Sequence, residues 1–252
     1  RDRIYSELPK ARVTAVCDLN SKRAEAVAKE FKIEKHFTDY RELLEEPDIE
    51  AVSVTTPDFL HRDPVVEALK SGKHVLCEKP LATTVEDAKA MVQAAKSAGV
   101  KLMTGFELRW KPSVIQTKQA IENGEIGEPM MANARLEDRI SVPTEMLGWA
   151  SKTSPAFFLL SHLIDLVRWI FGVEAERVYA QSISKILKAR GIETEDAILA
   201  LVSFRDGKIA TFTTSWILPN TLPRVVDGEV RFVGSKGCIK FDLLDQGFSK
   251  CG

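Results

Sequence analysis

The sequence contains few cysteines and carries almost no net charge. Its 252 residues include four cysteines, which are far apart, and the first two fall inside apolar stretches. This spacing gives neither a disulfide framework nor a CxxC metal site, so we expect reduced thiols and no bound metal. Lys and Arg together number 35 against 36 Asp and Glu, and no basic arm is present. A nucleic-acid partner is therefore not expected.

Long apolar stretches are also absent. No segment approaches the roughly 20 apolar residues that a membrane helix needs, and the opening RDRIYSELPK contains no signal-peptide core. We therefore expect a cytoplasmic protein without a membrane partner. With 44% hydrophobic and 28% charged residues, the chain has an ordinary globular composition and can form one large domain or two moderate ones.

Short apolar stretches alternate with amphipathic helical ones over the first hundred residues. Residues 11–18, ARVTAVCD, form a continuous apolar run, and apolar residues recur at helical spacing in 21–31. The alternation is repeated in 49–57 and 61–72, then in 74–80 and 84–99, and it ends with the strand-like 100–105. Buried strands between amphipathic helices predict a doubly wound, Rossmann-type α/β domain with a parallel sheet over residues 1–104.

One element of a dinucleotide-binding fold is missing from the sequence. The G-x-G-x-x-G fingerprint belongs between the first strand and the first helix, yet the chain opens in a helix-like stretch and the motif does not follow later. We therefore expect the first strand and its glycine loop to precede Arg1, so that the domain over 1–104 is incomplete.

The pattern changes after Gly105. Residues 154–172 are apolar on nearly every side, which predicts a buried helix that ends at Gly172. Two strand pairs are predicted after it, one around the turn Asp206-Gly207 and one around Gly234 to Gly237. Residues 105–252 are thus predicted to form an α+β domain with a mainly antiparallel sheet.

Asp18 stands where the first strand-like run ends. In a dinucleotide-binding fold an acidic residue at such a place bonds the adenosine ribose hydroxyls, which favours NAD. Arg23 is close enough in sequence to offset its charge, so NADP stays possible. The alternative is that Asp18 is only the N-cap of the following helix.

Glu78 and Lys79 follow the apolar run 74–77 directly. The carboxyl ends of parallel strands are where α/β proteins bind ligands, so the pair invites assignment to a site. Taken alone, Lys79 is better explained as marking the exit of a strand into solvent.

Several stretches together resemble the Gfo/Idh/MocA family of oxidoreductases. Residues 52–92 are similar to its T-P-x-x-x-H and E-K-P signatures, 162–172 to its H-x-x-D helix, and 231–242 to its G-x-x-G hairpin. The motifs occur in the family's order across nearly the whole chain. The resemblance implies an NAD(P)-dependent oxidoreductase that acts on the CH-OH group of a sugar, cyclitol or related polyol.

The resemblance also implies roles for single residues. Those expected along the cofactor, besides Asp18, are Thr55, Thr56, Pro57, His61, Glu78 and Lys79. Lys79 is also expected to stabilise the developing alkoxide, and His162 to act as the acid/base. Arg109 and Asp165 are expected to contact substrate. For most of these residues a purely structural role stays open. It is a polar helix start for His61, a satisfied core histidine for His162 and a surface ion pair for Arg109. For Asp165 it is an ion pair with Arg168 or a cap interaction elsewhere. A cis Lys79-Pro80 bond is plausible because proline lowers the cost of cis.

One position departs from the family's D-x-G-x-H-x-x-D pattern. The chain has Phe158 and Leu160 where many members have Asp and Gly. A carboxylate that could orient the imidazole of His162 is thus absent there, and Glu107 is one residue that could replace it.

Two other functions stay open on the sequence. A protein that binds NAD(P) as a regulator or sensor would keep the fold without turnover, and an NAD-dependent glycosidase-like enzyme would use the cofactor transiently. For any of them, we expect the sheet of the second domain to associate with a second copy in a homodimer or homotetramer.

Overall fold

The computed structural model describes residues 2–244 and 248–251, and the chain divides into the units Arg1–Thr104 and Gly105–Gly252. All strand pairs in the first unit are parallel, which confirms the predicted class. Two sheets result: β1 with β2, and β3 with β4 and β5. Their bounds are Ala15–Cys17 for β1, Lys35–Phe37 for β2, Ala51–Val54 for β3, His74–Cys77 for β4 and Leu102–Thr104 for β5.

The helices of the first unit begin and end at strong local signals. Asn20 caps α2 by accepting from the Arg23 N–H, and Thr84 caps α5 in the same way. Gly99 ends α5 in the left-handed conformation. The helices are α1 Asp2–Glu7, α2 Ser21–Phe31, α3 Tyr40–Leu44, α4 Arg62–Lys70 and α5 Val85–Ala98, with a 3-10 turn at Asp58–Leu60.

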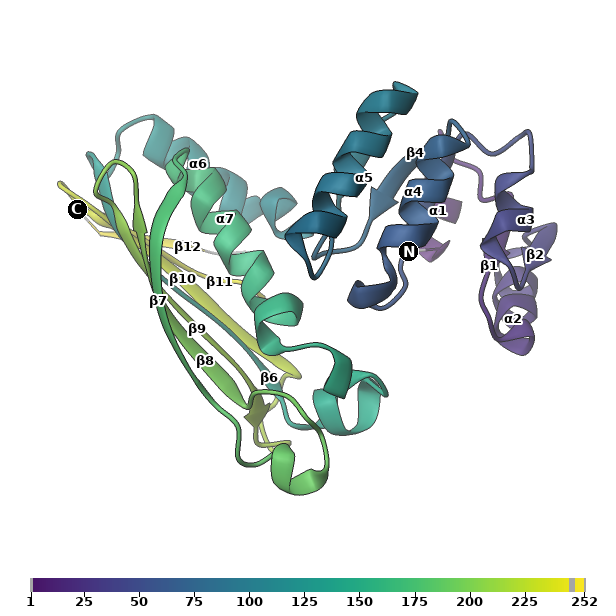
Figure 1. The fold of residues 1–252 in the computed structure, drawn as a ribbon. Helices are drawn as coiled ribbons and strands as arrows, with labels where there is room; N and C mark the ends of the chain where they lie inside the picture. Colours follow the sequence, from purple (N-terminus) through teal and green to yellow (C-terminus); the bar gives the residue numbers. More distant parts are fainter. Residues whose placement is uncertain (1, 245–247, 252) are drawn as a thin grey trace. The chain divides into compact units, whose positions relative to one another are not determined.

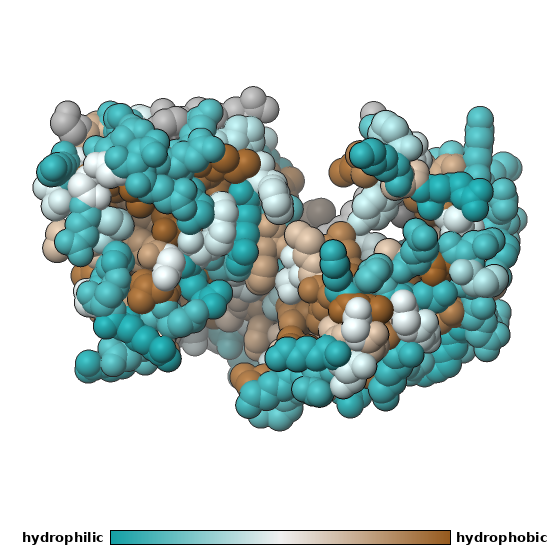
Figure 2. Space-filling model, turned by 90° about the horizontal axis from the view of Figure 1, so that it is seen from above, coloured by the Kyte–Doolittle hydropathy of each residue, from teal (hydrophilic) through white to brown (hydrophobic). Residues whose placement is uncertain are grey.

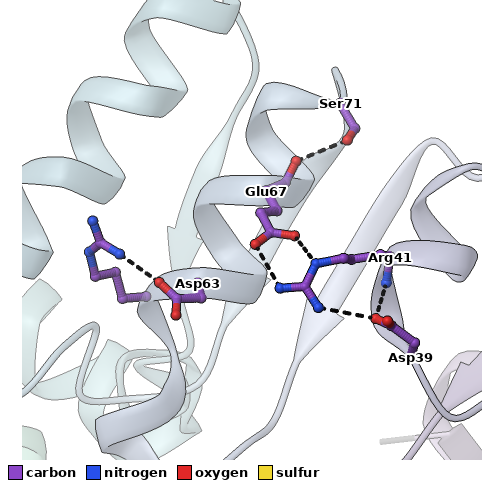
Figure 3. A network of polar contacts seen from close by, with 6 residues as sticks. Asp39, Arg41, Asp63, Glu67 and Ser71 are labelled. Carbon is purple, nitrogen blue, oxygen red and sulfur yellow. Dashed lines mark hydrogen bonds and ion pairs between the residues drawn. The ribbon is translucent and has the colours of Figure 1, made fainter.

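Polar side chains join α3 to α4 (Figure 3). The Arg41 guanidinium meets Glu67 through Nε, 3.0 Å from Oε2, and through Nη2, 3.2 Å from Oε1. The backbone N–H of Arg41 donates to Asp39, which caps α3. Burial and the neighbouring Glu67 carboxylate raise the pKa of Tyr40 to about 12. Because Arg41 and Glu67 are both partly exposed, the pair fixes geometry more than it adds stability.

The second unit is built on a seven-stranded sheet in the order β12-β11-β10-β6-β9-β8-β7. All its neighbouring pairs are antiparallel except β6 with β9, which is parallel. The two predicted strand pairs are confirmed as β8–β9 and β10–β11. The bounds are β6 Pro129–Arg139, β7 Ala175–Ile183, β8 Ala197–Phe204, β9 Ile209–Leu218, β10 Val226–Gly234, β11 Cys238–Asp242 and β12 Phe248–Cys251.

Two helices cover one face of this sheet (Figure 1). They are α6, Pro112–Glu122, and α7, Ser161–Phe171, and both contribute to one core with the inward side chains of the sheet. A π-helical turn, η5 (Ala156–Leu160), leads directly into α7, and Gly172 ends α7 in the left-handed conformation. The predicted buried helix is confirmed, with its first turn wound more widely.

Shorter turns complete the second unit. They are η2 Glu107–Trp110, η3 Val142–Met146, η4 Ala150–Lys152 and η6 Lys188–Arg190. On the face of the molecule in Figure 2, hydrophilic side chains predominate and hydrophobic ones form smaller patches.

The hairpin between β10 and β11 needs a glycine at position 234. Its tip packs against 126–128, where the N–H groups of Ser235 and Lys236 donate to the carbonyls of Glu128 and Ile126, both at 2.9 Å. A Cβ on Gly234 would collide with the Ile126 carbonyl oxygen. Close backbone approach therefore explains the first glycine of the G-x-x-G hairpin.

Candidate active site

The ends of β3 and β4 bring two candidate segments side by side. Val54 is paired with Cys77 at the last position of both strands, so Thr55 and Glu78 follow at the same edge of the sheet. The N–H of Glu78 donates to the Val54 carbonyl at 2.9 Å, which extends the pairing by one residue. Polar side chains thus gather at the carboxyl ends of parallel strands, where α/β folds bind nucleotides.

The segment after β4 turns sharply. The Lys79-Pro80 peptide bond is cis, as the sequence suggested. Glu78 accepts the N–H of Lys79 through Oε2 at 3.0 Å, and both side chains are partly buried. A carboxylate and an ammonium group are therefore next to each other in the sequence, directly after β4.

His61 lies behind these strand ends and is 1% exposed. Its Nδ1 is 2.9 Å from the Pro80 carbonyl oxygen, and its Nε2 is 2.9 Å from that of Thr56. The sequence predicts that His61 lies along the cofactor, whereas in the structure both of its ring nitrogens face backbone carbonyls. The contacts tie the segment after β3 to the segment after β4.

Asp18 follows β1 and is not a helix cap. Asn20 occupies the cap position of α2, so the N-cap alternative for Asp18 is wrong. Asp18 accepts the Asn20 N–H through Oδ1 at 2.8 Å, and its Oδ2 is 3.4 Å from Nη1 of Arg23. Its side chain is 33% exposed and that of Arg23 is 70% exposed, so the carboxylate is held but reachable.

The candidate positions of the first unit all follow parallel strands. Thr55, Thr56 and Pro57 follow β3, Glu78 and Lys79 follow β4, and Asp18 follows β1. Carboxylates at strand ends suit ribose hydroxyls, which are hydrogen-bond donors. The donor set of the first unit therefore fits a dinucleotide, while among the described residues no group of His, Cys, Asp and Glu is arranged to hold a metal ion.

In the second unit, His162 lies on the buried side of α7. Its Nδ1 is 3.8 Å from Oε1 of Glu107, which belongs to η2. The His162 side chain is 9% exposed and that of Glu107 is 60% exposed. The two form an ion pair whenever the imidazole is protonated.

Arg109, from the same turn, reaches the same helix. Its Nε donates to Oδ2 of Asp165 at 2.7 Å and its Nη2 donates to Oδ1. The guanidinium also lies 5.6 Å from the ring centroids of Phe106 and Trp169. The alternative of a pair between Asp165 and Arg168 is wrong, because Arg168 binds Glu174.

Phe158 takes part in an aromatic cluster. Its ring centroid is 6.1 Å from that of Trp149 and 6.0 Å from that of Trp216. Trp216 is fully buried, and its Nε1 donates to the Glu195 carbonyl at 2.6 Å. The position where the family's pattern has Asp is thus occupied by a partly buried aromatic side chain that packs against the core.

Asp196 follows Glu195 in the sequence, and its own carbonyl accepts the backbone N–H of Trp216 at 3.2 Å. It is 1% exposed and accepts the N–H groups of Lys185, Ile186 and Leu187 at 2.7, 2.7 and 2.9 Å. Burial by itself raises the pKa of Asp196, but the three donors outweigh it and lower the pKa below its usual value. Asp196 is not predicted from the sequence, because an Asp before an apolar strand has no distinctive pattern.

Two family models match the chain. The one described as oxidoreductase family, NAD-binding Rossmann fold, matches residues 2–106, and the Gfo/Idh/MocA C-terminal domain model matches residues 114–240. Together they cover both units.

Among individual proteins, the chain is 36% identical to a 1,5-anhydro-D-fructose reductase of Ensifer adhaerens over 79% of its own length. It is 31% identical to the scyllo-inositol 2-dehydrogenase (NAD(+)) of Bacillus subtilis over 96% of its length. It spans 60% of the first relative and 69% of the second. Among solved structures, levoglucosan dehydrogenase in complex with NADH and L-sorbose superposes with a TM-score of 0.84 at 26% identity, covering 95% of this chain and 70% of that one. Within the described residues, no helix is long and apolar enough to cross a membrane.

Proposed function

The chain belongs to the Gfo/Idh/MocA family of oxidoreductases, and on that premise we propose that its protein transfers a hydride between a sugar, cyclitol or related polyol and NAD. The observation that carries the proposal is the Glu78-Lys79 pair at the end of β4. The relatives named above, which act on sugars and inositols by their names, support the substrate class.

The cofactor is held by the strand ends of the first unit. Asp18 binds the adenosine ribose, Thr55, Thr56 and Pro57 lie along the dinucleotide, and Glu78 binds the second ribose. The carboxylate of Asp18 disfavours a 2′-phosphate, so NAD is preferred, although Arg23 at 3.4 Å tempers that preference and NADP is the weaker alternative.

Two side chains handle the charge and the proton. When bound, NAD supplies the nicotinamide ring that accepts the hydride. The Lys79 ammonium stabilises the alkoxide that develops on the substrate oxygen. His162 takes the hydroxyl proton, since imidazole changes charge near neutral pH.

Arg109 and Asp165 contribute to substrate binding as a pair. A guanidinium has five N–H donors, and Asp165 engages two of them. The remaining donors of Arg109, whose side chain is 31% exposed, contact substrate hydroxyls.

The proposal is tested on the purified full-length protein. Nucleotide that copurifies is identified by mass spectrometry, and NADH formation is followed with inositols, anhydro sugars and aldoses. Oxidation of a polyol with net NADH release supports the proposal. Bound nucleotide without turnover on any of them would favour a sensor, and bound NAD with glycoside cleavage but no net NADH would favour a glycosidase-like enzyme.

The sheet of the second unit supports self-association. Its face opposite α7 exposes apolar side chains that neighbour one another across strands: Tyr179 is paired with Leu201, and Leu199 lies two residues away on β8. Their exposed fractions are 67%, 43% and 58%. We propose that a second copy covers this face in a dimer or tetramer.

Light scattering tests the assembly. Replacing Tyr179 and Leu201 by Glu should shift the mass toward the monomer, because two charges would then be buried against the partner. Val92→Glu, at an exposed apolar position of α5, is the matched control and should leave the mass unchanged.

We further propose the cytoplasm as the location, consistent with the four free cysteines.

A further inference from the structure

His162 needs a partner that fixes its ring if it is to accept a proton from one nitrogen. In catalytic histidines a carboxylate on the second nitrogen commonly sets the tautomer and orientation. For His162, the candidates are the carboxylates of the second unit that lie close to Nδ1.

Positions 158 and 165 do not supply a carboxylate to Nδ1 of His162. Position 158 carries a phenylalanine that packs between Trp149 and Trp216, so that turn of the helix supplies no carboxylate. Asp165, one turn after His162, receives an N–H donor of Arg109 on each oxygen. Its negative charge is therefore balanced by the guanidinium.

Glu107 is in reach. Its Oε1 is 3.8 Å from Nδ1 of His162, which is within ion-pair distance although longer than a hydrogen bond. Glu107 and Arg109 leave the same turn, two residues apart, and reach His162 and Asp165, three residues apart on α7. The ion pair of Arg109 with Asp165 thus fixes the turn that carries Glu107.

Other ionisable groups also lie near α7. Among the described residues, the elements in contact with α7 include η2, η5, β6 and β9, of which η5 and β9 carry no ionisable side chain, and α6, whose Lys118 contacts Trp169. On β6, Asp138 shares the core-facing register of Ala134 and Leu136 and is 2% exposed. Asp138 is therefore the competing carboxylate that a test must separate from Glu107.

We propose that Glu107 is the positioning residue that orients His162 and stabilises its protonated ring, in place of the carboxylate that the family's pattern puts at position 158. The inference rests on the proposed function of His162 as the base. Glu107 touches neither the hydride nor the transferred proton, and it acts only through Nδ1.

A substrate-free measurement tests the contact. The chain has four histidines, so imidazole resonances can be assigned with one His→Gln variant each. Glu107→Gln should lower the titration midpoint of His162 by roughly one pH unit or less, because an opposite charge at this distance favours the cation. Glu107→Asp should fall between wild type and Glu107→Gln. The control Glu174→Gln removes a carboxylate that pairs with Arg168 of the same helix and should leave the midpoint unchanged.

Steady-state kinetics with NAD and myo-inositol test the consequence. Glu107→Gln should lower kcat by roughly 10- to 100-fold, the usual cost of losing an orienting carboxylate, and should move the acid limb of the pH profile to lower pH with KM for NAD unchanged. An unchanged His162 midpoint in Glu107→Gln, or a shift produced by Asp138→Asn instead, overturns the inference. If His162→Ala keeps full turnover, the proposed function of His162 fails, whereas loss in His162→Ala without loss in Glu107→Gln overturns the inference alone.

Discussion

Arg109 and Asp165 hold each other through two parallel hydrogen bonds, although 56 residues separate them in the sequence. The Asp165 side chain is 8% exposed, so the guanidinium compensates a nearly buried charge. Arg109→Ala should therefore lower the free energy of unfolding of the second unit by about 2–4 kcal/mol, because an unpaired carboxylate stays behind.

The double variant Arg109→Ala/Asp165→Ala separates pairing from other effects. Urea denaturation should show that it loses less than the sum of the two single variants, since one interaction is removed only once. Additive losses would show that the two residues stabilise the unit independently.

Lys79 and His162 should each be needed for turnover. Lys79→Ala and His162→Ala are expected to lower kcat by roughly 10²-fold or more, the scale of losing a charge-stabilising donor or a general base. The double variant should lose much less than the product of the single losses if both act on one hydroxyl. Rates are measured with saturating NAD and a polyol that the wild type oxidises, and wild-type turnover in Lys79→Ala would refute the assignment.

Phe158→Asp should destabilise the protein. Since Phe158 packs against two tryptophans, the change removes an aromatic side chain and buries a carboxylate beside indole rings. We expect a loss of about 3–5 kcal/mol by urea denaturation, as for large-to-small core changes. Phe158→Leu, which keeps the site apolar, should cost clearly less, and equal losses would mean that the added charge is harmless.

Asp196 should make stability depend on pH. Its three backbone N–H donors lower its pKa in the folded state, so its contribution is present above the unfolded value of about 3.9 and disappears as pH falls through the folded value. Asp196→Asn should cost about 2–3 kcal/mol at pH 7, because the amide loses the charge and one acceptor. The difference in free energy of unfolding between wild type and Asp196→Asn should be smaller at pH 3 than at pH 7.

The matched control for Asp196 is Asp206→Asn, which alters an exposed turn whose carboxylate also has a lowered pKa. Its effect at pH 7 should be much smaller, because solvent screens that carboxylate. If Asp196→Asn lowers the free energy of unfolding by the same amount at pH 7 and pH 3, the role assigned to the charge of Asp196 is contradicted.

His61 should couple stability to cofactor binding. His61→Phe removes the ring N–H, which in a neutral imidazole donates to only one of the carbonyls of Thr56 and Pro80, and should lower the free energy of unfolding of the first unit by about 1–3 kcal/mol. KM for NAD should rise more than kcat falls, because the segments after β3 and β4 lose their connection. The exposed His36→Phe should change neither quantity, and a His61→Phe variant with wild-type stability would show that the ring contacts carry no weight.

Local signals in the sequence determined much of the first unit. The helices α2 and α5 have polar caps, apolar residues at helical spacing and, for α5, a terminating glycine, and the predicted ranges contain the observed ones. The strands β2, β6, β7 and β12 were not predicted. β2 has only three residues and β7 is exposed along its whole length, so neither shows the alternation that burial imposes. β6 does alternate in burial, but its sequence contains none of the β-branched residues that are typical of a strand.

Motif order was enough to identify the family and to single out Glu78, Lys79 and His162. The partners of the site residues depended on the tertiary structure: Arg109 with Asp165, Glu107 with His162, and the His61 ring with two carbonyls. Periodicity reports only which side of an element is buried. Which charged side chains then meet depends on how distant elements pack, and for these pairs only the packing of η2 on α7, and of the segments after β3 and β4, brought the groups within a few ångströms.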